Sequence, residues 1–200
     1  MNLSIAILAG GMSRRFGADK TLALLDGRPL IQWVYDGATQ ISTDIMVIAK
    51  DPDKYDFLKS ARMVLDVYEQ QCAMVGIITA LEAAIHDDVF VISADMPLFL
   101  FAALNEMMYI GKTDAIVPEI AGKLYPCAAI YRKSALTSFK EHYARQDFRL
   151  MNLFKAISVS YPTDALFCKY VAPKFSLQAT QLTFINVNTQ EDLARISLQI

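Results

Sequence analysis

Short apolar runs alternate with longer amphipathic segments along most of the chain. The apolar runs predict strands that are covered on both faces, because they show little alternation between apolar and polar positions. The amphipathic segments predict helices, and two of them begin with a proline, which is best tolerated in the first helical turn. The predicted strands cover residues 3–8, 44–48, 63–65, 89–93, 115–117 and 125–131. The predicted helices cover residues 29–40, 52–60, 75–85, 98–108 and 134–143.

The last part of the chain is less regular. Residues 149–157 fit a short helix, whereas residues 158–181 are polar and aromatic without a clear period. A final short strand is predicted at residues 182–187. Thr189 followed by Asp192 predicts a capped helix at the C-terminal end. No internal repeat and no linker rich in Pro, Gly or Ser divides the chain, so residues 1–200 are expected to form a single domain.

Alternating strand and helix units of this length predict an α/β fold. The expected architecture is a three-layer αβα sandwich, in which helices cover both sides of a mainly parallel sheet. In such folds ligands bind beyond the carboxyl ends of the strands. The loop after residues 3–8 and the loop after residues 89–93 both lie at that edge, so functional residues are expected in these two loops.

The first of these loops combines glycines with cationic side chains. Gly10 and Gly11 follow the strand directly, and Arg14, Arg15 and Lys20 come shortly after. Glycines at the end of a strand let backbone N–H groups approach a ligand closely, and the cations supply charge for a triphosphate. The alternative interpretation is a tight turn followed by a solvated pair of arginines.

Two better-known phosphate loops do not fit this segment. A dinucleotide-binding loop needs G-x-G-x-x-G, but Gly10 and Gly11 are adjacent and the next glycine is Gly17. A Walker loop needs glycine immediately before Lys-Ser/Thr, but residues 18–19 separate Gly17 from Lys20. An oxidoreductase that binds NAD is therefore excluded, and another kind of nucleotide-binding loop is expected.

The second loop carries an acidic residue. Asp95 follows the strand at residues 89–93, and Pro97 restricts the chain after it. A carboxylate at this edge of the sheet is well placed to hold Mg²⁺ against phosphates. The alternative is an N-cap for a helix that begins at Pro97, and the two roles do not exclude each other.

Composition and charge narrow the classes of partner. With 200 residues, 54% of them hydrophobic, and a formal net charge of −2, the chain has a large apolar core and no basic field for nucleic acid or anionic membranes. No apolar run has the length of a membrane span or the form of a signal peptide. Cys72, Cys127 and Cys168 are scattered, which disfavours a disulfide framework or a zinc site and suits a reducing cytoplasm.

Four motifs in consistent order span nearly the whole chain. They are Leu8-Ala9-Gly10-Gly11-x-Ser13-x-Arg15-Phe16-Gly17-x-Asp19-Lys20, Gly27-Arg28-Pro29-Leu30, Asp95-x-Pro97 and Asn186-Val187-Asn188-Thr189-x-Glu191-Asp192. Together they resemble the molybdenum cofactor guanylyltransferases of the nucleotidyltransferase superfamily. The resemblance implies a Rossmann-like fold, GTP as donor, Mg²⁺ as cofactor, and transfer of GMP to the terminal phosphate of molybdenum-molybdopterin with release of pyrophosphate. It also implies contact with the insertion chaperones of molybdoenzymes.

The resemblance assigns roles to individual residues. It makes Arg15, Lys20 and Asp95 catalytic, with Asp95 as the Mg²⁺ ligand, and it places Asn186 and Asn188 at the acceptor. The resemblance also places Asp66 near the nucleoside. Without the resemblance, Asp66 is equally well explained as a turn residue, and Asn186 and Asn188 as a turn and a helix cap. The implied nucleotide-binding residues are Leu8, Ala9, Gly10, Gly11, Ser13, Lys20, Asp66, Gly76 and Asp95.

The chain also departs from the family pattern. Residues 72–76 read Cys-Ala-Met-Val-Gly where Gly-Pro-Leu-Ala-Gly is usual, and Ala49 stands where asparagine is usual. Tyr125 replaces a common histidine, and Gln190 a common proline. These departures leave the base and the acceptor open, so a cytidylyltransferase for the same cofactor or a phospho-sugar nucleotidyltransferase stays an alternative. A non-catalytic nucleotide-binding protein is a further alternative. The joint presence of the cations Arg15 and Lys20 and the acidic residue Asp95 disfavours it.

Overall fold

A seven-stranded sheet forms the centre of the computed structural model, which describes residues 2–10, 19–66, 68–168 and 177–197. The order of its strands is β11-β7-β10-β6-β1-β4-β5. Only β10 is antiparallel to its neighbours in this sheet, so the predicted mainly parallel α/β architecture is confirmed. The strands are β1 (Leu3–Leu8), β4 (Asp44–Ala49), β5 (Arg62–Leu65), β6 (Asp88–Ser93), β7 (Ala115–Ile116), β10 (Ala128–Arg132) and β11 (Val159–Ser160).

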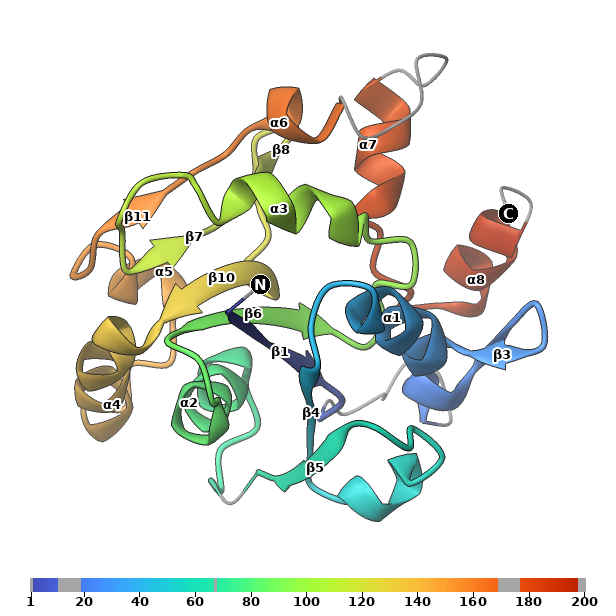
Figure 1. Cartoon of the computed structure of the whole chain (residues 1–200), viewed down its shortest axis with the longest axis horizontal. Helices are drawn as coiled ribbons and strands as arrows, with labels where there is room; N and C mark the ends of the chain where they lie inside the picture. Colours follow the sequence, from blue (N-terminus) through green and yellow to red (C-terminus); the bar gives the residue numbers. More distant parts are fainter. Residues whose placement is uncertain (1, 11–18, 67, 169–176, 198–200) are drawn as a thin grey trace.

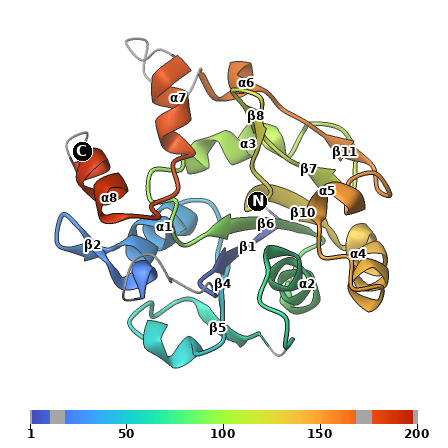
Figure 2. The ribbon, with the colours of Figure 1, turned by 180° about the vertical axis from the view of Figure 1, so that it is seen from behind.

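Helices cover both faces of the sheet and give the expected three layers (Figures 1 and 2). One face carries α2 (Ala73–Ala83), α4 (Leu136–Ala144) and α5 (Leu150–Leu153). The other carries α1 (Leu30–Thr39), α3 (Leu104–Met107), α6 (Asp164–Cys168) and α7 (Leu177–Thr183). No helix in the described part of the chain has the length and apolar character needed to cross a membrane.

Strand β1 shows why the sheet needs cover on both sides. Its alternate residues Leu3, Ile5 and Ile7 pack in the core on the α1 side, whereas Ala6 packs in the core on the α2 side. All four side chains are fully buried. A strand with apolar residues on both faces is stable only at the centre of a covered sheet.

Two hairpins were not predicted, although the first carries the Asp-Gly signal of a hairpin. The turn Asp26-Gly27 joins β2 (Leu24–Leu25) to β3 (Arg28–Pro29), and the turn Ala121-Gly122 joins β8 (Glu119–Ile120) to β9 (Lys123–Leu124). In both turns the two residues have positive φ, 47° and 74° in the first and 50° and 73° in the second. Positive φ at both positions defines the type I′ turn, whose second position favours glycine.

Two predictions in the helical and C-terminal regions are wrong. Residues 182–187 do not form a strand, because α7 continues to Thr183 and the following residues have no regular structure. Their apolar pattern instead buries Phe184, whose ring meets those of Phe99 and Phe167 at centroid distances of 5.5 and 4.8 Å. The helix predicted at residues 52–60 is only the 3-10 turn η2 (Pro52–Tyr55).

The predicted C-terminal helix is present as α8 (Gln190–Ser197). Its first turn is capped reciprocally, because the Asp192 N–H donates to Oγ1 of Thr189 at 3.1 Å and Oδ2 of Asp192 accepts from the Thr189 N–H at 2.9 Å. Leu25, Leu30, Val187 and Ile196 form a small buried cluster that packs the first hairpin against α1 and α8. The short helices η1 (Lys20–Leu22), η3 (Phe101–Ala103) and η4 (Lys133–Ala135) complete the fold.

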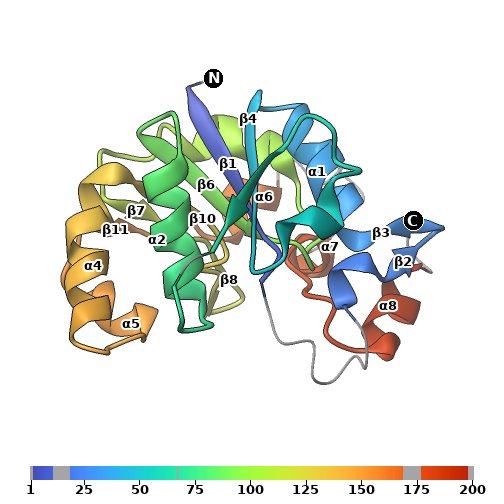
Figure 3. The ribbon, with the colours of Figure 1, turned by 90° about the horizontal axis from the view of Figure 1, so that it is seen from below.

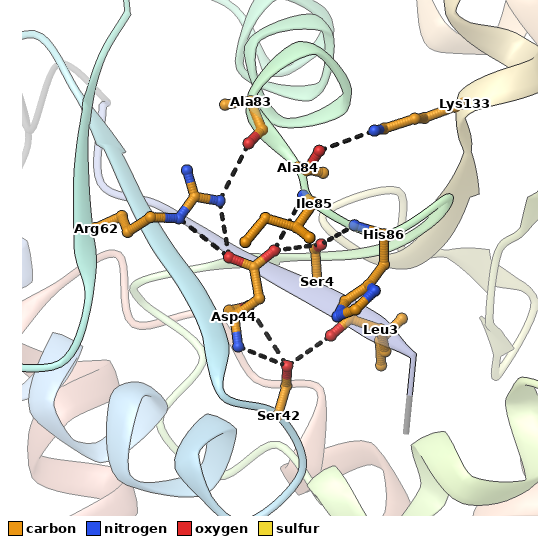
Figure 4. A network of polar contacts seen from close by, with 10 residues as sticks. All are labelled: Leu3, Ser4, Ser42, Asp44, Arg62, Ala83, Ala84, Ile85, His86 and Lys133. Carbon is orange, nitrogen blue, oxygen red and sulfur yellow. Dashed lines mark hydrogen bonds and ion pairs between the residues drawn. The ribbon is translucent and has the colours of Figure 1, made fainter.

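A buried polar network ties the starts of the strands together (Figure 4). Asp44, at the start of β4, accepts hydrogen bonds from Ser4 at 2.5 Å, from Arg62 at 2.7 Å and from the Ile85 N–H at 3.1 Å. Burial alone would raise the pKa of Asp44, but these hydrogen bonds and the charge of Arg62 outweigh it and hold the pKa below its usual value. The network therefore joins three strands and the end of α2 at the edge opposite the carboxyl ends.

Candidate active site

The carboxyl ends of four parallel strands meet at one edge of the sheet. Strand β1 runs from the N-terminus toward the side of the molecule where α8 lies (Figure 3). Backbone hydrogen bonds lock the residues that follow these strands, since the Ala9 N–H donates to the Ile48 carbonyl at 2.9 Å and the Ala94 N–H to the Leu8 carbonyl at 3.0 Å. The loops predicted to hold functional residues therefore start from a rigid base.

Lys20, Asp95 and Asn188 meet at this edge although they are far apart in the sequence. The ammonium of Lys20 donates a hydrogen bond to Oδ2 of Asp95, with which it forms an ion pair. It also donates to Oδ1 of Asn188 at 3.0 Å. The Val187 N–H donates to the Asp95 carbonyl at 2.9 Å and brings the C-terminal segment to this loop. The structure thus joins one predicted residue from each of three motifs.

The position of Lys20 is fixed by the residues next to it. Asp19 caps η1, and its Oδ1 accepts hydrogen bonds from the N–H and the hydroxyl of Thr21 at 3.2 and 2.7 Å. The hydroxyls of Thr21 and Tyr55 are 2.8 Å apart, and Tyr55 in turn donates to the Ala9 carbonyl at 3.4 Å. This chain of contacts holds η1 against the end of β1.

The carboxyl group of Asp95 is buried, and only one of its two oxygens accepts a hydrogen bond from the described residues. The residue is 3% exposed. Its Oδ1 and that of Asn186 are, among the described residues, the buried side-chain oxygens that accept no hydrogen bond. Burial, with a smaller contribution from the charge of Asp95, raises the pKa of the nearby Cys127 thiol to about 12. That thiol is therefore neutral at physiological pH and does not repel the carboxylate.

The N-cap interpretation of Asp95 is wrong. The first helical residue after it is Phe101, and the N-cap position of that helix is Leu100. Asp95 lies instead in the turn that follows β6. A buried carboxylate with an unused oxygen, in a turn and not in a cap, must be explained by something other than helix formation.

The donor set fits a magnesium ion that is shared with a substrate. In the described part of the chain, no three or more His, Cys, Asp or Glu side chains gather to form a metal cage. Mg²⁺ is commonly bound through one or two carboxylates together with substrate phosphates, and Oδ1 of Asp95 is a free carboxylate oxygen of this kind.

A pocket at the carboxyl ends of β1, β4 and β5 is lined by five of the predicted nucleotide-binding residues, whereas Lys20 and Asp95 are not among its lining residues. Leu8, Ala9, Gly10, Asp66 and Gly76 all contribute to its wall. The remaining wall comes from Asp19, Ile48, Ala49, Lys50, Asp51, Lys54, Tyr55, Gln71, Cys72 and Ala73. Predicted residues Gly11, Ser13 and Arg15 lie outside the described residues.

The two glycines of the pocket play different parts. A Cβ at Gly76 would lie 3.0 Å from Cδ2 of Leu8, so glycine allows α2 to pack closely on β1. Among the described residues, a Cβ at Gly10 would meet only the Ile48 carbonyl, at 4.0 Å. Gly10 is therefore not required by packing among these neighbours, and its missing side chain leaves the pocket open at that point.

A second cavity lies on the Asn188 side of Lys20. Both predicted acceptor residues, Asn186 and Asn188, line it together with Lys123, Tyr125 and Arg195. The ammonium of Lys123 lies 4.9 Å from the centroid of the Tyr125 ring. Since Thr189 provides the cap of α8, the side chain of Asn188 is left to contact Lys20, and the interpretation of this asparagine as a cap is wrong.

Several residues of these cavities were not predicted from the sequence. Lys50 and Lys54 are cations at the end of β4 and in η2, and Lys123 and Arg195 are cations in the second cavity. None belongs to one of the four motifs, so only the fold brings them to the site. The signal that could have found Lys50 is its position directly after a predicted central strand.

A comparison with known families decides the class of this chain. Residues 5–160 match the family described as "MobA-like NTP transferase domain". The chain belongs to the MobA-like NTP transferase family. The predicted family relationship and the Rossmann-like fold are therefore confirmed, and the chain is a member of a nucleotidyltransferase enzyme family.

MobA-like relatives match along nearly the whole chain. A "probable molybdenum cofactor guanylyltransferase" from Aquifex aeolicus is 32% identical, with 95% of this chain and 88% of the relative covered. A "molybdenum cofactor guanylyltransferase" from Desulfosudis oleivorans is 29% identical, with 97% and 94% covered. The crystal structure of the molybdopterin-guanine dinucleotide biosynthesis protein A from Archaeoglobus fulgidus has a TM-score of 0.81 at 23% identity and covers 98% of this chain and 97% of its own, which supports the fold.

Proposed function

We propose that this protein transfers GMP from GTP to the terminal phosphate of a molybdopterin-type cofactor and releases pyrophosphate. The observation that carries the proposal is the contact of Lys20 with Asp95 and with Asn188, which lines the second cavity. Relatives over nearly the full length carry the name of a molybdenum cofactor guanylyltransferase, which supports this choice of donor and acceptor.

The donor nucleotide is assigned to the pocket at the ends of β1, β4 and β5. Backbone groups of Ala9 and Gly10 provide close contact without side-chain obstruction. The carboxylate of Asp66, which also lines this pocket, accepts hydrogen bonds from hydroxyl or N–H groups of the nucleoside. The triphosphate extends toward Lys20, whose charge offsets the charge of the phosphates.

The acceptor is assigned to the cavity on the Asn188 side. Lys123 and Arg195 give this cavity two cations for an anionic ligand, and Tyr125 gives it an aromatic ring. Oδ1 of Asn186 is buried without a donor among the described residues, so a ligand N–H group would satisfy it. This combination suits a flat, nitrogen-rich ring that carries a phosphate.

The chemistry requires positioning and charge stabilisation more than an activated side chain. A terminal phosphate of the acceptor is already anionic near neutral pH, so it attacks the α-phosphorus without a general base from the protein. The bond from the α-phosphorus to the bridging oxygen breaks, and pyrophosphate leaves with the negative charge. Lys20 stabilises the charge that accumulates on the phosphate oxygens, and Asn188 orients its ammonium.

Asp95 is proposed to hold the magnesium ion through its free Oδ1. When bound, Mg²⁺ supplies Lewis-acid stabilisation of the phosphate oxygens. With the metal in place, Lys20 is shared between Oδ2 of Asp95 and the triphosphate, so the ion pair keeps the lysine close to the reacting group.

Thermal unfolding with four nucleotides tests the donor. With Mg²⁺ present, GTP is expected to raise the melting temperature more than CTP, ATP or UTP at equal concentration, because a ligand that binds only the folded state stabilises it. Equal shifts for all four nucleotides would contradict the guanine assignment. Release of pyrophosphate from GTP that depends on the metallated acceptor then distinguishes an enzyme from a nucleotide-binding protein.

Replacing Lys20 by alanine is expected to weaken GTP binding and lower turnover, each by about tenfold or more, because the proposed charge-assisted hydrogen bond from its ammonium to phosphate is lost. Isothermal titration with GTP and a pyrophosphate-release assay measure the two effects. Lys59→Ala is a control for the loss of one positive charge outside the pocket lining. Unchanged affinity and rate in Lys20→Ala would show that Lys20 does not contact the triphosphate.

A further inference from the structure

Lys50 lines the donor pocket, and its ammonium contacts other residues of the protein. It follows β4, and its ammonium donates to the Asp66 carbonyl at 2.8 Å and to the Tyr68 carbonyl. The same ammonium lies 3.6 Å from Oδ2 of Asp66. Lys50 therefore bridges the ends of two neighbouring strands through one acidic residue.

The carboxylate of Asp66 is held from the other side as well. Its Oδ1 accepts hydrogen bonds from the Tyr68 N–H at 3.3 Å and from the hydroxyl of Thr79 in α2 at 3.4 Å. The Asp66 N–H donates to the Ala49 carbonyl at 2.9 Å. The Asp66 side chain is only 10% exposed, yet it lines the donor pocket. A carboxylate held by contacts on both oxygens has few orientations left to it.

We infer that Lys50 is a positioning residue for the donor nucleoside, which acts by fixing the Asp66 carboxylate in the pocket wall. The inference rests on the proposed function in that it assigns this pocket to a nucleotide. The two lysines therefore have different roles. Lys50 orients the carboxylate that contacts the nucleoside, whereas Lys20 contacts the phosphates.

The competing interpretation is that Lys50 binds phosphate directly, as a lysine in a nucleotide pocket commonly does. The contacts favour positioning, since two backbone carbonyls and a carboxylate already surround the ammonium. Moving Lys50 to a phosphate would leave these acceptors without their donor.

Ligand fragments separate the two interpretations. Lys50→Met is expected to raise the dissociation constants of GTP and GMP by about tenfold and to leave that of pyrophosphate unchanged, because a misplaced Asp66 affects only the nucleoside end. In steady state, KM for GTP rises and kcat stays within about twofold of wild type. Lys50→Gln provides the same measurement if Lys50→Met melts below the assay temperature.

A double-mutant cycle and a matched control complete the test. In an Asp66→Ala background, Lys50→Met is expected to cause little further loss of GMP affinity, because Lys50 acts through Asp66. The control is Lys59→Met, which removes one positive charge from an exposed lysine outside the pocket lining. Lys59→Met is expected to leave GMP affinity unchanged.

Three results would overturn the inference. They are a loss of pyrophosphate affinity with GMP affinity intact in Lys50→Met, additive losses in the cycle, and an equal loss of GMP affinity in Lys59→Met. If wild type prefers another base, the guanine assignment fails, and the variants measured with that nucleotide still decide the role of Lys50. If wild type binds no nucleotide, both proposals fail together.

Discussion

Asp95→Asn is expected to lower the rate of pyrophosphate release from GTP by about 10³-fold and to leave the fold intact. Asparagine removes the charge that pairs with Lys20 and the free carboxylate oxygen proposed to hold Mg²⁺. Losing one preorganised electrostatic contact to a transition state typically costs about 10²- to 10³-fold, and here two such contacts depend on one side chain. Turnover is measured at saturating GTP and acceptor over a range of Mg²⁺ concentrations, with circular dichroism to follow the fold.

The matched control for this result is Asp88→Asn, the same substitution at the opposite end of β6. Asp88 accepts a hydrogen bond from Arg132 at 2.8 Å, far from the donor pocket. We expect its turnover to stay within about twofold of wild type, because uniform charge effects over such a distance are screened by salt. Turnover of Asp95→Asn close to that of Asp88→Asn would reject the metal-binding role of Asp95.

Asp44→Ala is expected to lower the free energy of unfolding by about 3 kcal/mol, because it removes a buried carboxylate that pairs with the exposed Arg62 and leaves the buried Ser4 hydroxyl and the Ile85 N–H without their acceptor. For a chain of this size, that loss lowers the melting temperature by about 6–12 °C. Chemical denaturation and calorimetry measure the two quantities. The control is Glu141→Ala, which removes an exposed ion pair to Arg145 and is expected to change stability by less than about 0.5 kcal/mol.

The pH dependence of stability gives an independent readout for Asp44. Its pKa is lower in the folded protein than in the unfolded chain, so the carboxylate stabilises the fold fully above its unfolded pKa. This stabilisation is lost as the pH falls through the folded pKa. We expect wild type to lose its advantage over Asp44→Ala below about pH 4, where the unfolded carboxyl begins to protonate. A difference between the two proteins that stays constant down to pH 2 would contradict this role.

The sheet and its site edge could be predicted from the sequence because their signals are local. Residues 3–8 and 89–93 are continuous apolar runs, and a parallel sheet brings the residues after such strands to one edge. Asp66, which follows β5, reached the donor pocket for the same reason. The contact of Lys20 with Asp95 was expected only as a shared edge, since no local rule gives a distance between side chains.

What was missed depends on tertiary packing or on very short elements. The Asp26-Gly27 turn is a hairpin signal, but two-residue strands on either side are too short to show a period. Residues 182–187 have a strand-like composition, yet burying Phe184 among aromatic rings satisfies their apolar side chains without a sheet partner. The role of Lys50 depends on the Asp66 and Tyr68 carbonyls, which no sequence pattern brings to it.

Strand β1 runs from the Asp44 network to the donor pocket, and the distance between these two sites matters for protein engineering. Ser4, near its start, belongs to the Asp44 network, and Leu8, at its end, lines the donor pocket. The six residues of this strand span roughly 20 Å, so substitutions at its two ends share no partners and their free energies should add. A variant library aimed at a new donor base can therefore start from a parent thermostabilised around Asp44, without reshaping the pocket that is under selection.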